Sequence, residues 1–233
     1  MTEDKVQSKY GGFANLIKAY GNDEAALLKD NPSLNNLYMF SNQRAGIAEW
    51  LNIKPDSNIL LLGFESVALT EYLLKNAKEL YIWDKEGFFE EVLRTAFSED
   101  KKLIKFNAAF KNQGTEIKFD YIIAAFNPDI SPAVNVKTGF SDLKELLSDS
   151  GRFIFAVDNS YGIKYLLGAT PDEYVLSRKE LALKFEQAGF GEFTFYYPVS
   201  DYRLPLSLYS DRYLPKKGDL SSDLPAYDYP DVA

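Results

Sequence analysis

The sequence of 233 residues contains no cysteine and no histidine. The absence of cysteine excludes disulfides and thiolate metal ligands. The absence of histidine excludes the Ser-His and Cys-His nucleophile pairs, imidazole metal ligands and the most common general base. Any acid–base chemistry must therefore use Asp, Glu, Lys or Tyr side chains, and we expect no metal site.

The chain also lacks an excess of positive charge and a long apolar run. Its 26 Lys and Arg residues stand against 34 Asp and Glu residues, which gives a net charge of −8. A nucleic-acid binder needs a basic face, so we expect no nucleic-acid partner. No apolar run approaches the roughly 20 residues that span a bilayer, and the N-terminus lacks the apolar segment of a secretory signal. We therefore expect a cytoplasmic protein without a membrane span.

Core-forming residues, in contrast, are abundant. The hydrophobic share is 46%, with 17 Phe and 16 Tyr, which suffices for one large domain.

The chain divides into three expected parts. Apolar residues at helical spacing predict an N-terminal helical segment over residues 1–52, including one helix over 37–51. Residues 214–233 are polar and contain proline, which is typical of a tail or of a linker to a fused downstream domain. An α/β domain over 53–213 is expected between these two parts.

Within residues 53–213, short apolar runs alternate with amphipathic helices. Runs that are apolar on both faces are typical of parallel strands covered on both sides. The expected strands are 59–62, 80–83, 103–106, 121–125, 153–157, 193–197 and 204–209. The expected helices are 69–75, 87–97, 141–147 and one that opens at a Ser177–Glu180 capping box and ends at Gly189. This alternation predicts an α/β fold with a doubly wound, mostly parallel seven-stranded sheet.

The most informative stretch is the first expected strand, which runs into Gly63 and then a helix. In a doubly wound sheet the ligand lies outside the carboxyl ends of the strands. Asp84 ends the second expected strand, where an acidic residue can take the ribose hydroxyls of a nucleotide. One glycine and one aspartate fit a nucleotide site and an ordinary turn with a capping aspartate equally well. A dinucleotide-binding α/β protein is one alternative for this pattern.

From about Leu37 to Leu220 the sequence resembles class I S-adenosylmethionine-dependent methyltransferase domains encoded with bacterial surface-polysaccharide enzymes. The resemblance is carried by residues 37–44 with Glu49-Trp50, Gly63 with 68–70, 158–165, 195–198, 201–205 and 209–215. The last three stretches are the most specific, because aromatic, Pro and Asp residues rarely recur at fixed spacing by chance. The resemblance implies a Rossmann-like methyltransferase fold, S-adenosylmethionine as cofactor, a glycan or its precursor as methyl acceptor, and glycan-assembly enzymes as partners.

The resemblance also implies site residues. It places cofactor contacts at Gly63, Phe64, Glu65, Asp84, Asn107 and Ala125, with Asn112 as an alternative to Asn107. It places substrate-facing residues after the fifth strand, at Asp158, Asn159 and Tyr161. It assigns no catalytic residue.

The first cofactor motif departs from the pattern of the family, which reads acidic-x-Gly-x-Gly-x-Gly. Leu61 stands at the acidic position, Glu65 at the second glycine and Val67 at the third. A side chain at 65 stands where backbone should touch the cofactor, and a β-branched residue at 67 tolerates positive φ badly. For Glu65 we weigh a general base aimed into the cleft against a surface residue that closes the loop, and favour the second.

Two hypotheses of function follow from this motif. The first is a degenerate methyltransferase fold that serves as a scaffold or interaction domain. The second is an active O- or N-methyltransferase with an unusual loop. The three substitutions in one cofactor loop favour the first.

Overall fold

The computed structural model describes residues 3–21, 23–84, 87, 89–98, 100–106, 117–125, 140–171, 175–199 and 201–219. The helices are α1 (Glu3–Tyr20), α2 (Glu24–Asp30), α3 (Leu34–Phe40), α4 (Gly46–Glu49), α5 (Val67–Asn76), α6 (Glu90–Phe97), α7 (Phe140–Leu146), α8 (Ile163–Leu166) and α9 (Arg178–Gln187), with a 3-10 turn η1 (Asn42–Ala45). The strands are β1 (Asn58–Leu62), β2 (Glu79–Trp83), β3 (Leu103–Phe106), β4 (Phe119–Ala125), β5 (Leu147–Ala156), β6 (Tyr196–Val199) and β7 (Ser207–Ser210).

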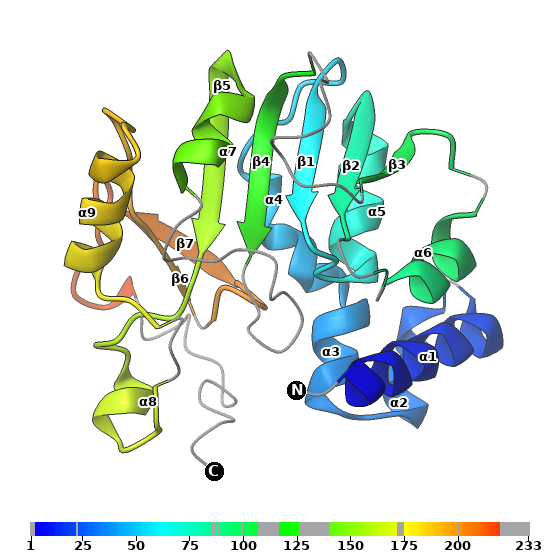
Figure 1. Ribbon diagram of the computed structural model, residues 1–233. Coiled ribbons are helices and arrows are strands. Elements are labelled where there is room, and N and C mark those ends of the chain that lie inside the picture. Colours follow the sequence, from blue (N-terminus) through cyan, green and yellow to red (C-terminus); the bar gives the residue numbers. More distant parts are fainter. Residues whose placement is uncertain are drawn as a thin grey trace.

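The main sheet has five strands in the order β3-β2-β1-β4-β5, and each neighbouring pair is parallel (Figure 1). The α/β fold with a parallel sheet is therefore confirmed. The strand order reverses between β1 and β4, and this switch point is where sheets of this kind bind ligands, outside the carboxyl ends of the strands.

The prediction of a single seven-stranded sheet is wrong for the described residues. Strands β6 and β7 pair with each other, antiparallel, in a separate two-stranded sheet. The last strand also starts later than predicted. Leu204 closes a turn by donating its N–H to the Asp201 carbonyl, and Pro205, which has no N–H to donate, follows it before β7 begins at Ser207.

Helices cover both faces of the main sheet, as the doubly wound prediction requires (Figure 1). Alternate strand residues belong to two separate cores: Leu61 packs in one and Leu60 in the other. The first core also receives residues from α1 to α6, and the second receives residues from α7 and α9. The period-two alternation of side chains along a strand produces these two layers.

Strand β5 begins six residues before the predicted run at 153–157. Phe119 pairs with Leu147, and the register then shifts before Tyr121 pairs with Arg152. At this irregularity a Cβ on Gly151 would stand 2.7 Å from the Phe119 carbonyl oxygen, a distance that real Cβ atoms do not reach. Glycine at 151 therefore permits the bulged pairing, which the apolar pattern could not reveal.

Helices α1, α2 and α3 lie beyond the carboxyl ends of β1 and β2 (Figure 1). The predicted helix over 37–51 is divided at Ser41, which has extended backbone angles and caps η1 by accepting a hydrogen bond from the Gln43 N–H. Aromatic residues of α1 and α3 share the core of the sheet. No helix among the described residues has both the length and the apolarity to cross a membrane.

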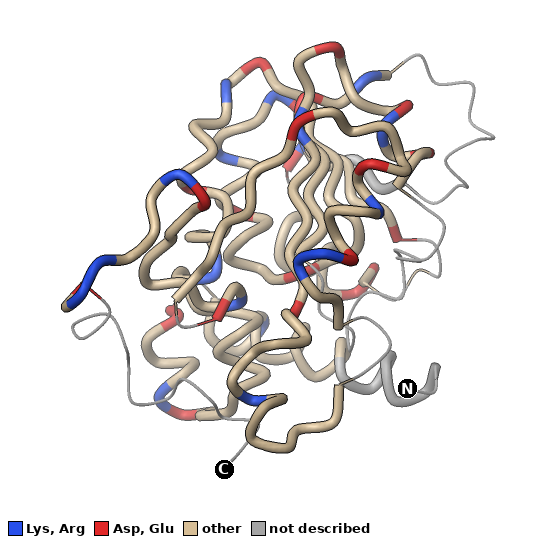
Figure 2. The backbone as a smooth tube through the Cα atoms, turned by 90° about the vertical axis from the view of Figure 1, so that its left-hand side faces the viewer, with Lys and Arg blue, Asp and Glu red and all other residues tan. Residues whose placement is uncertain are grey.

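Helix ends follow the sequence signals. The Ser177 hydroxyl accepts a hydrogen bond from the Glu180 N–H, and the Glu180 carboxylate accepts one from the Ser177 N–H, so the predicted capping box is confirmed. These hydrogen bonds hold the pKa of Glu180 below its ordinary value. Along the described chain, basic and acidic residues are interspersed (Figure 2).

Candidate functional site

The turn between β1 and α5 is built around Gly63. Its φ of 85° lies in the left-handed region that favours glycine, and its N–H donates to the Trp83 carbonyl at 3.1 Å. Ser66 then caps α5, because its hydroxyl oxygen accepts from the Leu69 N–H at 3.0 Å. Val67 is the first helical residue and needs no positive φ. The predicted strand, turn and helix are therefore present, with one glycine sufficient for the turn.

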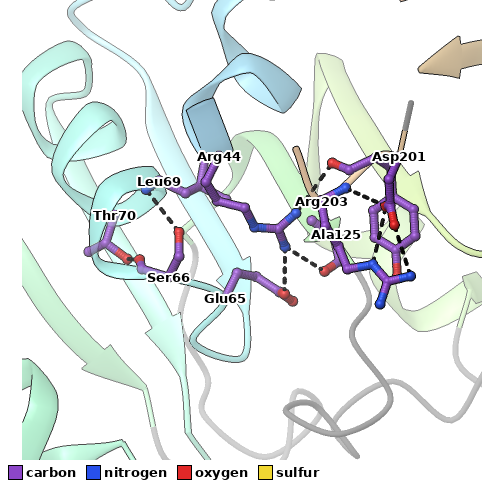
Figure 3. Close-up of polar contacts among 9 residues, drawn as sticks. Arg44, Glu65, Ser66, Leu69, Thr70, Ala125, Asp201 and Arg203 are labelled. Carbon is purple, nitrogen blue, oxygen red and sulfur yellow. Dashed lines mark hydrogen bonds and ion pairs between the residues drawn. The ribbon is translucent and has the colours of Figure 1, made fainter. Parts of the chain in front are cut away.

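Glu65 does not lie on the surface, so the favoured interpretation of a surface residue is wrong. Its side chain is 0% exposed and forms an ion pair with Arg44, whose side chain is 2% exposed; the Nη2 and Oε2 atoms are 3.2 Å apart. Arg44 also donates from Nη1 to the Tyr202 carbonyl at 3.3 Å and from Nη2 to the Ala125 carbonyl at 3.4 Å. Figure 3 shows the two side chains meeting beside the end of β4. One guanidinium thus joins the β1–α5 turn, β4 and the segment around 202.

Burial raises the pKa of Glu65 to about 8, although the charge of Arg44 and its hydrogen bond to the carboxylate oppose this shift. The contact is therefore a hydrogen bond from Arg44 to the carboxyl at low pH and becomes an ion pair as the carboxyl ionises near pH 8. Two buried atoms of the pair, Glu65 Oε1 and Arg44 Nε, have no hydrogen-bond partner in the described part of the chain. This buried contact therefore lowers the free energy of unfolding relative to a fully hydrogen-bonded pair, because each unsatisfied buried polar atom carries a desolvation cost.

On the β2 side of the turn, five aromatic residues form a cluster that we call the aromatic cluster: Tyr10, Phe13, Phe40, Phe64 and Phe89. Their ring centroids are 4.9 Å apart for Tyr10–Phe89 and 5.8 to 5.9 Å apart for Phe64–Phe89, Phe13–Phe40 and Tyr10–Phe13. All five are buried, and Phe64 is 0% exposed. Phe64 therefore packs in the core instead of lining an open cleft.

Asp84 is buried at the end of β2, and its Oδ2 atom accepts a hydrogen bond from the Phe89 N–H at 3.1 Å. This contact matches the capping alternative for Asp84, because the carboxylate satisfies a backbone donor where the chain enters α6. Asn107, the residue expected to meet the base of a cofactor, lies outside the described residues. The described residues contain no group of three or more carboxylates that could hold a metal ion.

The expected substrate-facing residues lie after β5. The Asp158 carboxylate is 2.8 Å from Lys164 Nζ, accepts a hydrogen bond from the Tyr165 hydroxyl at 3.0 Å, and lies 3.8 Å from Arg203 Nη2. Asn159 closes a turn, since its Oδ1 accepts from the Tyr161 N–H at 3.1 Å. Asp158 and Asn159 are thus engaged within the chain.

In the described part of the chain, groups of the protein itself pack beside the switch point between β1 and β4. The Arg44–Glu65 pair occupies the switch point on the β4 side, and the aromatic cluster occupies the β2 side. Gly63, Phe64 and Glu65 follow β1 in succession, and Arg44 connects Glu65 to the Ala125 carbonyl. Their role as cofactor contacts stays a prediction.

No family model matches the sequence, and no curated protein matches it. The structure of the chain is, however, similar to solved structures. The N-methyltransferase NodS from Bradyrhizobium japonicum, in complex with S-adenosyl-L-homocysteine, has a TM-score of 0.50 at 15% identity over 82% of this chain and 92% of NodS. A TehB-like SAM-dependent methyltransferase from Corynebacterium glutamicum has a TM-score of 0.45 at 13% identity, over 81% of this chain and 89% of that one. A DhpI–SAM–HEP complex has a TM-score of 0.47 at 12% identity, over 82% and 88%.

This chain has a methyltransferase-like fold. The predicted Rossmann-like methyltransferase architecture is confirmed at this level, and identities this low concern the fold alone. In this methyltransferase-like chain, sequence reasoning missed Arg44 as a buried group and Tyr202 as its backbone partner. The only signal for Arg44 was its place in the stretch 37–44, which precedes the cofactor motif.

Proposed function

We propose that this chain is a methyltransferase-fold domain that has lost S-adenosylmethionine binding in the switch-point crevice and serves as a scaffold or interaction domain. The observation that carries the proposal is the buried Arg44–Glu65 pair, which stands where a cofactor would meet the backbone of the turn. The association with surface-glycan assembly is supported by the sequence resemblance, above all by the stretches over 195–215.

Energetics favour the closed crevice. A ligand that entered beside Gly63 would have to displace Arg44 from at least the Ala125 carbonyl and Glu65. Hydrogen bonds to a charged group contribute about 1.5–3 kcal/mol each, so two of them oppose entry by about 3–6 kcal/mol. That cost corresponds to a loss of roughly 10²–10⁴ in affinity. A cofactor that depends on backbone contacts at the turn would then bind more weakly by this factor.

The second candidate is an active methyltransferase in which Glu65 acts as a general base. Its pKa of about 8 favours this role, because a base works best when its pKa lies near the operating pH. NodS and DhpI were solved with S-adenosyl-L-homocysteine or SAM bound, which makes the cofactor a reasonable ligand to test. The full burial of Glu65 weighs against this candidate, since a base must reach the proton that it abstracts.

Ligand titration tests the proposal. The purified chain is titrated with S-adenosylmethionine and S-adenosyl-L-homocysteine by calorimetry and by thermal shift, beside a cofactor-binding methyltransferase as positive control. We expect no heat of binding and no change in Tm at millimolar ligand. Binding in the micromolar range, with a Tm increase of several degrees from ligand linkage, would contradict the proposal and support the active enzyme. A response to a nicotinamide or flavin nucleotide instead would favour the dinucleotide alternative.

A further inference from the structure

Four large apolar side chains around α8 are exposed, and we call them the apolar tip: Tyr161 at 72%, Ile163 at 52%, Leu166 at 71% and Leu167 at 63%. They lie within seven consecutive residues. Figure 1 shows α8 beyond the carboxyl end of β5, apart from the other helices. Single exposed apolar residues are ordinary on a protein surface, whereas a group of four within one short segment is of the kind that is often functional.

The polar groups of Lys164 and Tyr165, in the same segment, both contact the Asp158 carboxylate. Lys164 is only 17% exposed on its side chain and places Nζ 2.8 Å from the Asp158 carboxylate. The Tyr165 hydroxyl donates to the same carboxylate at 3.0 Å. A short surface helix normally turns its charged residues to water and its leucines to the core. The reverse arrangement in α8 leaves leucines in water, which is unfavourable unless something apolar covers them.

Backbone hydrogen bonds hold the loop that carries the apolar tip. Its base is joined to the segment before α9 by a pair of hydrogen bonds: Ser160 N–H to the Leu176 carbonyl at 3.1 Å, and Leu176 N–H to the Asp158 carbonyl at 3.2 Å. Gly162 closes the turn by donating to the Asn159 carbonyl at 2.7 Å, and a Cβ at 162 would stand only 2.9 Å from that oxygen. The loop therefore presents the four apolar side chains in a defined arrangement.

We propose that the apolar tip inserts into the surface of a lipid bilayer with zwitterionic headgroups. The only charged residue in 159–171 is Lys164, and Asp158 neutralises it. The tip therefore offers no net charge to attract anionic lipid, and the chain as a whole, at −8, is repelled by it. Insertion of the apolar side chains, with Tyr161 at the level of the headgroups, does not require electrostatic attraction to the lipid.

Area and hydrogen bonding argue against a second copy or another protein as the occupant. Four large side chains at these exposures offer on the order of 500 Å², below the ~800 Å² that each partner buries in a stable interface. Protein interfaces also carry about one hydrogen bond per 100–200 Å². The polar groups of Asn159, Lys164 and Tyr165 are already engaged within the loop. A bilayer requires no reciprocal hydrogen bonds at its apolar level.

The test uses the full chain and phosphatidylcholine vesicles. Leu166→Ser/Leu167→Ser is expected to lower the fraction that sediments with vesicles at least tenfold, because both side chains are replaced by polar ones. The matched control is Leu183→Ser on α9, a residue that is 52% exposed, and this variant should bind like the unchanged chain.

Tyr161→Trp supplies a fluorescence reporter whose emission should shift to shorter wavelength on vesicles. Raising NaCl from 50 to 500 mM should leave binding unchanged, since no net charge is involved.

Several results would overturn the proposal. One is an unchanged chain that neither sediments nor shifts its reporter emission at millimolar lipid. Another is binding that requires anionic lipid and disappears with salt. A third is a concentration-dependent dimer that is lost in Leu166→Ser/Leu167→Ser, which would make a second copy the occupant. Equal loss of binding in Leu183→Ser would show that the tip has no special role. None of these measurements depends on whether S-adenosylmethionine binds.

Discussion

The free energy of unfolding is expected to fall as the pH rises from about 5 to about 8.5, and Glu65 is the cause. Burial raises its pKa from an ordinary 4.5 to about 8 in the folded protein. Between these values the folded chain keeps a proton that the unfolded chain releases, so the stabilisation is complete below about 4.5 and is lost as pH rises through about 8. At about 1.4 kcal/mol per pKa unit, the loss is on the order of 3–5 kcal/mol.

The composition reduces the number of other side chains that titrate in this pH range. The sequence has no histidine, the one side chain whose ordinary pKa lies between 5 and 8. Glu65 is a fully buried carboxyl whose raised pKa lies in this range. The part of a decline in stability that Glu65→Gln abolishes therefore reports on Glu65.

Urea denaturation at half-unit steps from pH 5 to 8.5 measures the effect, with Glu65→Gln as the matched variant. The amide has the shape of the protonated acid and cannot ionise. We expect the variant to match the unchanged chain near pH 5, to show a flat profile, and to be the more stable of the two at pH 8.5. Parallel profiles for the two proteins would show that Glu65 is exposed to water or ionised in the fold.

The sequence allowed the parallel sheet to be predicted because its signals are local. Strands β1, β2 and β4 are short apolar runs bounded by turn residues, and each lies within one or two residues of the predicted range. The turn at Gly63 and the capping box at Ser177 are equally local, because each depends on a few neighbouring residues. Backbone geometry and short-range hydrogen bonds determine such features, so one sequence suffices to find them.

The contents of the crevice could not be predicted in this way. Arg44 and Glu65 are 21 positions apart, and Arg44 and Tyr202 are 158 apart. A charged residue just after a turn glycine is ordinarily exposed, so the local pattern predicts a surface position for Glu65. The division of the seven strands into two sheets has a similar origin, because pairing between strands depends on contacts that no local pattern encodes.

Phe64→Ala is expected to lower the free energy of unfolding by about 3–5 kcal/mol, the range for removing a fully buried Phe side chain from a core. Phe64 is 0% exposed, and its ring packs 5.8 Å from that of Phe89 in the aromatic cluster. The matched truncation is Tyr161→Ala, which removes an aromatic side chain that is 72% exposed. It should cost less than about 0.5 kcal/mol. Urea unfolding of the three proteins at pH 6, where Glu65 is protonated, separates the two effects.

The same substitution distinguishes a closed crevice from an open one. If the Phe64 side chain faced water or ligand in an open crevice, its truncation would leave no dry cavity and would cost little. In a closed crevice, truncation leaves a cavity between the N-terminal helices and the sheet, with the full cost. A loss below 1 kcal/mol for Phe64→Ala would therefore contradict the packing of this side chain in the aromatic cluster. A loss of several kcal/mol would show that the Phe64 side chain belongs to the core, and ligand titration tests cofactor binding separately.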